Sequence, residues 1–237
     1  MIHVQVHLYT PIPNLITWRI RVMIWGSCTV FFSPVPQQRT MSALAAVLVA
    51  PLAAIVLHVA NYNATAQIEH KTRCFTKILG ANAVYYYAVY LVLSAAVRDA
   101  VIHSAIEASL PELQWIVLPV EIATIVGYGL FVVGILLNLW TLHALGIKGM
   151  YNGDSFGFLM DAPVTSGPYT IFSDPQYVGT TLAMFGAALR QQSIVGYALT
   201  LAMGIVFWIS VKFIEGPHLQ RLYSKKPSSS SKSAKRQ

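Results

Sequence analysis

Charged residues are scarce in this chain. Asp, Glu, Lys and Arg make up 11% of its 237 residues, whereas 55% are hydrophobic. A soluble globular domain carries roughly 25% charged residues, so this composition excludes an ordinary soluble protein. We predict an all-α fold: a polytopic integral membrane protein built as a helical bundle with about four membrane segments.

Acidic residues are especially few, and the first of the nine is Glu69. The formal net charge is +7, but six of the sixteen basic residues follow Gln220, where no acidic residue occurs. The rest of the chain therefore holds ten basic and nine acidic residues. The positive charge is a property of the tail, and we predict no nucleic-acid partner.

The chain has only two cysteines, Cys28 and Cys74, in unrelated surroundings. This excludes a disulfide framework, and no spacing typical of a metal site is present, so we predict no metal ion. The sequence also offers no obvious serine or cysteine triad.

Long intervals without formal charge predict where the chain crosses a membrane, since about 20 apolar residues span the hydrocarbon. The intervals are 41–68, 78–97, 122–147 and 191–211. The first is either a span or a re-entrant helix, because its second half is made polar by His58, Asn61, Asn63 and Gln67. A shorter apolar stretch, 177–189, either pairs with 191–211 as a hairpin or docks on the bundle.

The two ends of the chain differ from its middle. Residues 1–40 are an N-terminal extension, either a targeting sequence or a dispensable segment, because Met41 opens the first long apolar interval. Residues 41–223 form the predicted membrane domain. The Ser- and Lys-rich residues 224–237 are expected to be a disordered tail on the cytosolic side, because Lys and Arg resist translocation.

A connector over 145–179 has an unusual composition. It holds three of the chain's four aspartates together with six glycines, three prolines and six aromatic residues. Glycine permits unusual backbone conformations, whereas aromatic rings require packing. The combination indicates a structured site and not a flexible linker.

Two charged clusters flank the membrane segments. In "EHKTR" (69–73), the charges either anchor the membrane topology or allow Lys71 and Arg73 to bind a lipid phosphate. Glu215 follows the last segment and precedes Gly216. It either pairs with Lys212 on the same helix face or receives a cationic ligand.

The motifs "EHKTR", "GDSFGFLMDAPVTSGPYTIFSDPQYVGT" and "IEGPHLQRLY" resemble, in order and spacing, those of the phospholipid methyltransferases of the endoplasmic reticulum. The resemblance covers about 41–223. It implies S-adenosylmethionine as methyl donor and methylation of phosphatidyl-N-methylethanolamine and phosphatidyl-N,N-dimethylethanolamine to phosphatidylcholine. It further implies a bilayer phospholipid as partner and an endoplasmic reticulum location, with a mitochondrial membrane as a second possibility.

The resemblance also implies donor-binding residues. The Gly-x-Gly of the family falls, without gaps, on Val132, Val133 and Gly134, since an inserted residue would rotate the helix faces by about 100°. Gly127 then serves helix packing. Relatives carry two glutamates where this chain has Glu215 and Gly216, so one carboxylate is left for the donor.

The reaction requires a neutral amine, although the free amine has a pKa of about 10. Asp154 and His70 are the candidate proton acceptors, and each has a structural alternative, because an aspartate in a turn often binds only backbone amides. Lys71 and Arg73 are the candidate headgroup residues. Aromatic residues that either pack or contact a cation are Tyr151, Phe156, Phe158, Tyr169 and Tyr177.

If the connector and Glu215 form a single active site, both must lie on the same side of the membrane. A hairpin over 177–211 would bring the chain back to that side. Two rival functions stay open. One is a methyltransferase for another membrane substrate, such as a prenylcysteine. The other is a non-enzymatic membrane scaffold, which the missing second glutamate favours.

Overall fold

The computed structural model describes residues 4–7, 19–22, 37–108 and 113–224, and the chain divides into two compact units, Met1–Ala46 and Val47–Gln237. In the first unit, strands β1 (Val4–His7) and β2 (Arg19–Val22) pair in antiparallel fashion. Most of the predicted extension over 1–40 lies outside the described residues. The predicted tail lies outside them from residue 225 onward.

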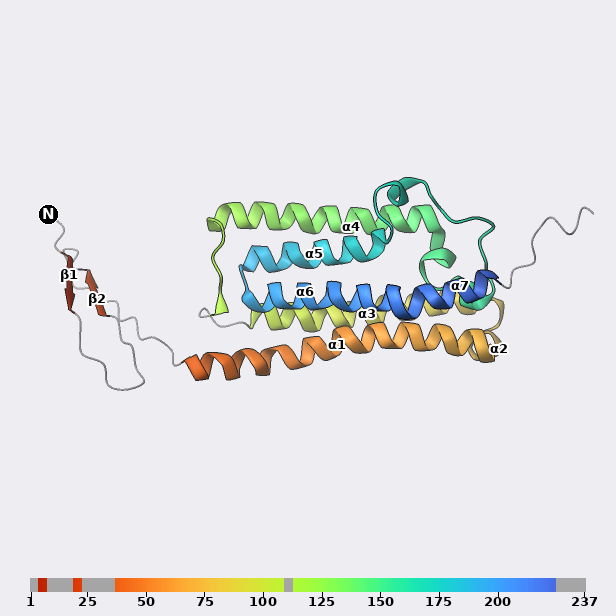
Figure 1. Cartoon of the computed structure of the whole chain (residues 1–237), viewed down its shortest axis with the longest axis horizontal. Coiled ribbons are helices and arrows are strands. Elements are labelled where there is room, and N and C mark those ends of the chain that lie inside the picture. Colours follow the sequence, from red (N-terminus) through yellow and green to blue (C-terminus); the bar gives the residue numbers. More distant parts are fainter. Residues whose placement is uncertain (1–3, 8–18, 23–36, 109–112, 225–237) are drawn as a thin grey trace, which may run out of the picture. The chain divides into compact units, whose positions relative to one another are not determined.

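The second unit is a bundle of long helices (Figure 1). The helices are α1 (Gln37–Thr72, which begins in the first unit), α3 (Ala83–Glu107), α4 (Val120–Met150), α5 (Pro175–Gln191), α6 (Ile194–Ile209) and α7 (Gly216–Ser224). Short elements join them: α2 (Cys74–Leu79), η1 (Gly80–Asn82), η3 (Gly153–Phe156) and η4 (Gly167–Thr170), with the π-helical η5 (Ser210–Glu215) between α6 and α7.

Four helical stretches are long and apolar enough to cross a membrane. They are Val47–Thr72, Cys74–Glu107, Val120–Phe156 and Ile194–Ser224. The predicted all-α membrane bundle with four membrane segments is confirmed. The first of these stretches belongs to one continuous helix, α1, which also includes the polar second half of the predicted first segment.

Polar side chains in the second half of α1 bind α3. The bonds join His58 Nδ1 to Ser94 Oγ (2.9 Å), Tyr90 Oη to Asn61 Oδ1 (2.8 Å) and Thr65 Oγ1 to Tyr87 Oη (2.7 Å). Polar groups inside a membrane bundle need such partners, because lipid offers none. Two of the polar residues that left the first interval open to a re-entrant path, His58 and Asn61, thus help to join α1 to α3.

Helices α5 and α6 form the hairpin that the sequence allowed. The turn is made by Gln192, with a left-handed φ of 47°, and by Ser193, whose hydroxyl accepts from Gly196 N at the start of α6. The Gln192 side chain accepts from Val117 N at 2.7 Å and donates to Leu118 O at 2.9 Å. The hairpin is thereby attached to the segment before α4.

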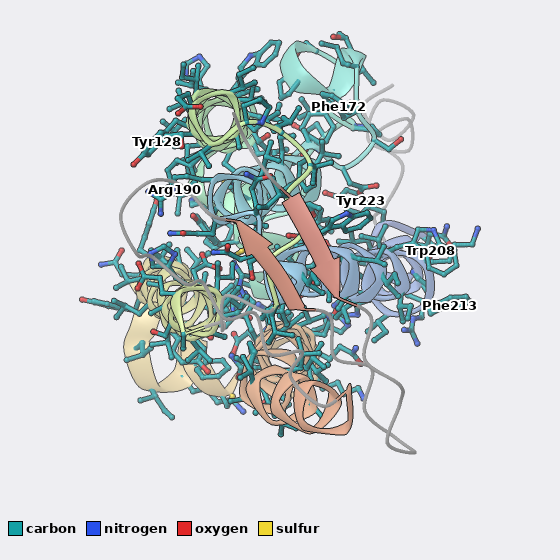
Figure 2. The ribbon with its side chains drawn as sticks, turned by 90° about the vertical axis from the view of Figure 1, so that its left-hand side faces the viewer. Tyr128, Phe172, Arg190, Trp208, Phe213 and Tyr223 are labelled. Carbon is teal, nitrogen blue, oxygen red and sulfur yellow. The ribbon has the colours of Figure 1, made fainter. Side chains whose placement is uncertain are left out.

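Arg190 of α5 contacts Tyr128 of α4 near the turn between α5 and α6. Arg190 Nη1 donates to Tyr128 Oη at 2.8 Å, and its guanidinium carbon lies 5.0 Å from the centre of the tyrosine ring (Figure 2). Such side chains are typical of the boundary between lipid and water.

Glycines set the distance between α4 and α5. A Cβ atom added at Gly127 would lie 2.7 Å from Gly186 O, and one at Gly134 would lie 2.6 Å from Ala183 N, beside Gly179. Neither position has room for a side chain. Small residues allow membrane helices to approach until their backbones touch, and the predicted packing role of Gly127 is confirmed.

Candidate active site

The π-helical segment η5 carries Glu215 at its end. A π-helical turn is rare and often occurs at functional sites. Gly216 follows it, and a Cβ atom at this position would lie 2.7 Å from Val211 O. A side chain at position 216 would therefore require this turn to shift.

A chain of hydroxyl groups holds Glu215. Tyr177 Oη donates to Glu215 Oε2 at 2.5 Å, and Tyr62 Oη lies 2.9 Å from Tyr177 Oη and 2.8 Å from Ser210 Oγ. Asn63 Nδ2 donates to the same Ser210 Oγ at 2.8 Å. Both ends of η5 are therefore tied to side chains of α1 and α5.

Which hydroxyl donates in each of these hydrogen bonds follows from the number of protons that each hydroxyl carries. Each hydroxyl has one, and that of Tyr177 goes to the carboxylate, so Tyr62 donates to Tyr177 and Ser210 donates to Tyr62. Hydrogen bonds in series polarise one another. The whole series is thus directed at the Glu215 carboxylate, which it fixes in place.

The next feature of Glu215 is the absence of a cationic partner within the described part of the chain. Among the described residues, no ion pair within 4.0 Å includes Glu215, and the alternative pairing with Lys212 is absent. The carboxylate is half-buried. A partly desolvated charge is stabilised by an opposite charge, so this carboxylate suits a cationic ligand.

Asp174 is a second carboxylate at this end of the bundle. It precedes Pro175 at the start of α5, where an aspartate commonly caps the helix, yet its side chain makes no capping hydrogen bond. Burial raises the pKa of Asp174. Burial raises the pKa of Tyr169, and the charges of Asp174 and Glu215 raise it further.

The connector brings Asp154 to α7. Tyr223 Oη donates to Asp154 Oδ1 at 2.6 Å, and Met160 N donates to Tyr223 Oη at 3.2 Å. The connector is therefore bonded to α7, the helix that begins directly after Glu215, and a site shared by Asp154 and Glu215 stays a prediction.

His70 joins the same region from the end of α1. Its ring lies edge-on to that of His218 on α7, with 5.5 Å between the centroids. The Nε2 atom of His218 lies 3.1 Å from Ser155 Oγ of the connector. All three sequence motifs thus converge on α7.

The remaining residues of "EHKTR" have separate roles. Glu69 is fully buried and accepts from Phe75 N at 2.8 Å and from the Thr76 hydroxyl, so it closes the turn into α2. Arg73 lies against the connector, because a Cβ atom at Gly157 would be 2.9 Å from Arg73 Nη2. Lys71 is exposed.

The predicted donor-binding residues of α4 lie in two environments. Val132 and Val133 are each 52% exposed, whereas Gly134 faces α5. The close contact of α4 with α5 explains a glycine at 134 by itself. Contact of Val132, Val133 or Gly134 with the methyl donor stays a prediction.

Sequence reasoning missed several residues of this site. They are Tyr62, Asp174, Ser210, His218 and Tyr223. Asp-Pro at a helix start looks like an ordinary cap, and a tyrosine near the end of an apolar segment looks like a membrane-boundary residue. The signals present in the sequence are the polar pair at 62–63 and the motifs that contain Asp174, His218 and Tyr223.

Comparison with known proteins fits this geometry. A family model described as "Phospholipid methyltransferase" matches residues 122–226, which include the connector, the hairpin and α7. No solved structure shows a significant match.

Relatives cover most of the chain. Phosphatidylethanolamine N-methyltransferase B of Dictyostelium discoideum is 58% identical over 177 residues, covering 75% of this chain and 88% of that protein. The chain belongs to the phospholipid methyltransferase family. Phosphatidyl-N-methylethanolamine N-methyltransferase of Emericella nidulans is 33% identical over 73% of this chain and 83% of its own length. Human phosphatidylethanolamine N-methyltransferase is 31% identical, and the match covers 78% of this chain and 92% of the human protein.

Membership of this family makes the chain a membrane-bound phospholipid N-methyltransferase, and nothing in the comparisons favours a prenylcysteine substrate or a scaffold. Within the described residues, no group of three or more His, Cys, Asp or Glu side chains is placed to hold a metal ion.

Proposed function

We propose that this enzyme transfers methyl groups from S-adenosylmethionine to phosphatidyl-N-methylethanolamine and phosphatidyl-N,N-dimethylethanolamine, and so forms phosphatidylcholine. The names of its relatives in Dictyostelium discoideum and Emericella nidulans support this substrate class. The observation that carries the proposal is the half-buried Glu215 carboxylate, fixed by Tyr177 and without a cationic partner among the described residues.

Glu215 is the proposed ligand of the donor's positive charge. The donor supplies a methyl group on a sulfonium, and its sulfur–carbon bond breaks as the nitrogen–carbon bond forms. Fixed positioning of both reactants contributes about 7 to 11 kcal/mol to such a displacement. The hydrogen-bonded series ending at Tyr177 fixes the carboxylate before the donor arrives. Gly216 and residues 132–134 are proposed to line the donor's site.

Asp154 is the proposed acceptor of the amine's proton, with His70 as the alternative. The lipid amine must lose a proton before its lone pair attacks, since its free pKa is about 10. Tyr223 holds Asp154 Oδ1, so the second carboxylate oxygen is the one that accepts. Lys71 and Arg73 are proposed to bind the lipid phosphate by charge-assisted hydrogen bonds.

The proposed location is the endoplasmic reticulum membrane, with a mitochondrial membrane as the alternative. The C-terminus is proposed to face the cytosol, because its basic residues resist translocation. The connector and Glu215 would then face the compartment that supplies the methyl donor.

The direct test is methyl transfer by the purified full-length protein in lipid vesicles. Radiolabelled methyl donor is added to vesicles that contain phosphatidyl-N-methylethanolamine, and labelled lipids are separated. Label in phosphatidylcholine supports the proposal. Label only in an added prenylcysteine favours the rival enzyme, and no label in either substrate favours a scaffold.

A further inference from the structure

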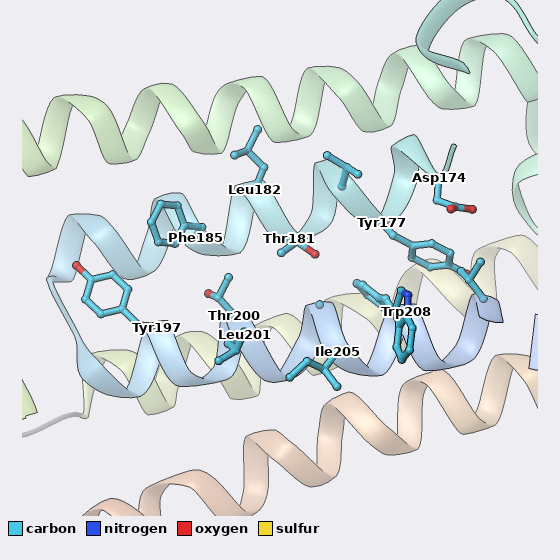
Figure 3. A pocket seen from close by; sticks show the side chains of 14 residues that line it. Asp174, Tyr177, Thr181, Leu182, Phe185, Tyr197, Thr200, Leu201, Ile205 and Trp208 are labelled. Carbon is cyan, nitrogen blue, oxygen red and sulfur yellow. The ribbon is translucent and has the colours of Figure 1, made fainter. Parts of the chain in front are cut away.

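An open groove runs between α5 and α6 beside the candidate site. Its volume is about 770 Å³, and its walls are mostly apolar side chains of the two helices. Figure 3 shows Asp174 and Tyr177 at one end and Tyr197 at the other. At the Tyr197 end, the ring packs near Phe185 and Trp115, with centroids 6.0 and 6.2 Å away, so aromatic rings close the groove there.

The groove opens outward, where lipid surrounds the bundle. Leu201, Ile205 and Trp208 line it and are 67%, 49% and 59% exposed. Its length fits one leaflet: the twelve residues from Asp174 to Phe185 span about 16 Å at the rise of an α-helix. Half of a bilayer's hydrocarbon core is about 15 Å thick.

The polar end of the groove is acidic. Asp174 lines the groove, and its side chain makes no capping hydrogen bond with α5. Tyr177 also lines the groove, and it donates to Glu215. A molecule that fits this groove therefore has an apolar chain and, at one end, a cationic head.

We propose that the groove between α5 and α6 holds an acyl chain of the phospholipid substrate, with the lipid amine at Asp174. This inference rests on the proposed function and adds the location of the lipid. The charge at Asp174 complements a protonated amine, whereas Glu215 stays available to the methyl donor. The acyl chain thus guides the nitrogen to the donor before the proton is removed.

Gly204 offers a way to block the groove. A Cβ atom at this position would meet only Thr181 Cγ2, at 3.8 Å, which is an ordinary contact. A larger side chain there would enter the groove without disturbing the helices. Gly129 is the matched control, because it is an exposed glycine of α4 with nothing within 4 Å of an added Cβ.

The first experiment compares Gly204→Leu, Gly129→Leu and the unchanged enzyme on substrates with dipalmitoyl and dibutanoyl chains. Gly204→Leu is expected to raise the KM for the dipalmitoyl lipid at least about tenfold, as steric changes in an apolar site do. The loss should be much smaller for the dibutanoyl lipid, and Gly129→Leu should match the unchanged enzyme. Equal KM values for Gly204→Leu and Gly129→Leu on the long-chain lipid would overturn the proposal.

A second variant tests the polar end. Asp174→Asn should raise the KM for the lipid to a similar degree with both chain lengths, because the headgroup is the same. The KM for the methyl donor should stay within about twofold. A donor KM that rises while the lipid KM is unchanged would place Asp174 with the donor and contradict the assignment.

Photo-crosslinking locates the lipid without turnover. A phosphatidyl-N-methylethanolamine with a diazirine in one acyl chain should label peptides of α5 and α6 in the full-length protein, and Gly204→Leu should reduce this label. Even labelling of all membrane helices, or equal competition by phosphatidylglycerol, would refute the inference. If the unchanged enzyme methylates no lipid, the proposed function fails, and the crosslink still decides whether the groove holds this lipid.

Discussion

Tyr62 is the residue on which the arrangement around Glu215 depends. It belongs to α1, yet its hydroxyl lies 2.9 Å from that of Tyr177 on α5 and 2.8 Å from Ser210 Oγ at the start of η5. One side chain thereby connects three parts of the chain that are far apart in sequence. It contacts neither the reacting amine nor the methyl in our proposal, so it is a positioning residue.

Replacement of Tyr62 by Phe removes both bonds and keeps the ring. One hydrogen bond contributes about 0.5 to 1.5 kcal/mol, so we expect the methyl-donor KM to rise by a factor of about 2 to 10. The lipid KM should change less. The control is Tyr90→Phe, which removes a bond of α3 to Asn61, away from η5. Equal donor KM values for the two variants would contradict the positioning role.

At the scale of the helices, pairs of glycines determine how closely α4 and α5 pack. Gly127 opposes Gly186, and Gly134 opposes Gly179, so α4 and α5 touch through their backbones. This contact fixes where α5 begins and hence where Tyr177 and Asp174 lie. Gly146 of α4 has a second role. Its φ of 65° and ψ of 174° interrupt the helix and redirect the chain into the connector.

The close contact of α4 with α5 predicts a strong effect of Gly127→Val. The added side chain meets Gly186 O at 2.7 Å, and overpacking of this kind costs about 1 to 3 kcal/mol. The melting temperature of the detergent-solubilised protein should fall by several degrees. Gly129→Val, two residues along on an open face, should leave it unchanged. Equal melting temperatures would show that the helices do not rely on this contact.

The helices and the hairpin could be predicted from the sequence because charge-free length and flanking charges decide them. Which helices pack against one another could not be predicted. In a membrane, lipid and neighbouring helices are both apolar, so the pattern of apolar residues does not tell which face of α4 meets α5. Glu69 illustrates the same limit: its capping of α2 depends on a left-handed Arg73, which no motif indicates.

At the scale of the whole membrane domain, the hairpin returns the chain to the end where the connector lies. The Tyr177–Glu215 bond requires this return. The prediction is that cysteines placed at Ser166 and Ser224 react with a membrane-impermeant reagent from the same side. A cysteine at Ile116, which precedes α4 and is 70% exposed, should react from the other side. These variants are made without Cys28 and Cys74. Labelling of Ser166 and Ser224 from opposite sides would exclude a shared site.

The central claim is that the Glu215 carboxylate binds the positive charge of the methyl donor. The most direct test measures choline-lipid formation by Glu215→Gln and by the unchanged enzyme over a range of donor concentrations. A hydrogen-bonded charge contributes about 1.5 to 3 kcal/mol, so we predict a donor KM at least about tenfold higher for Glu215→Gln. Undiminished turnover at limiting donor would contradict the account.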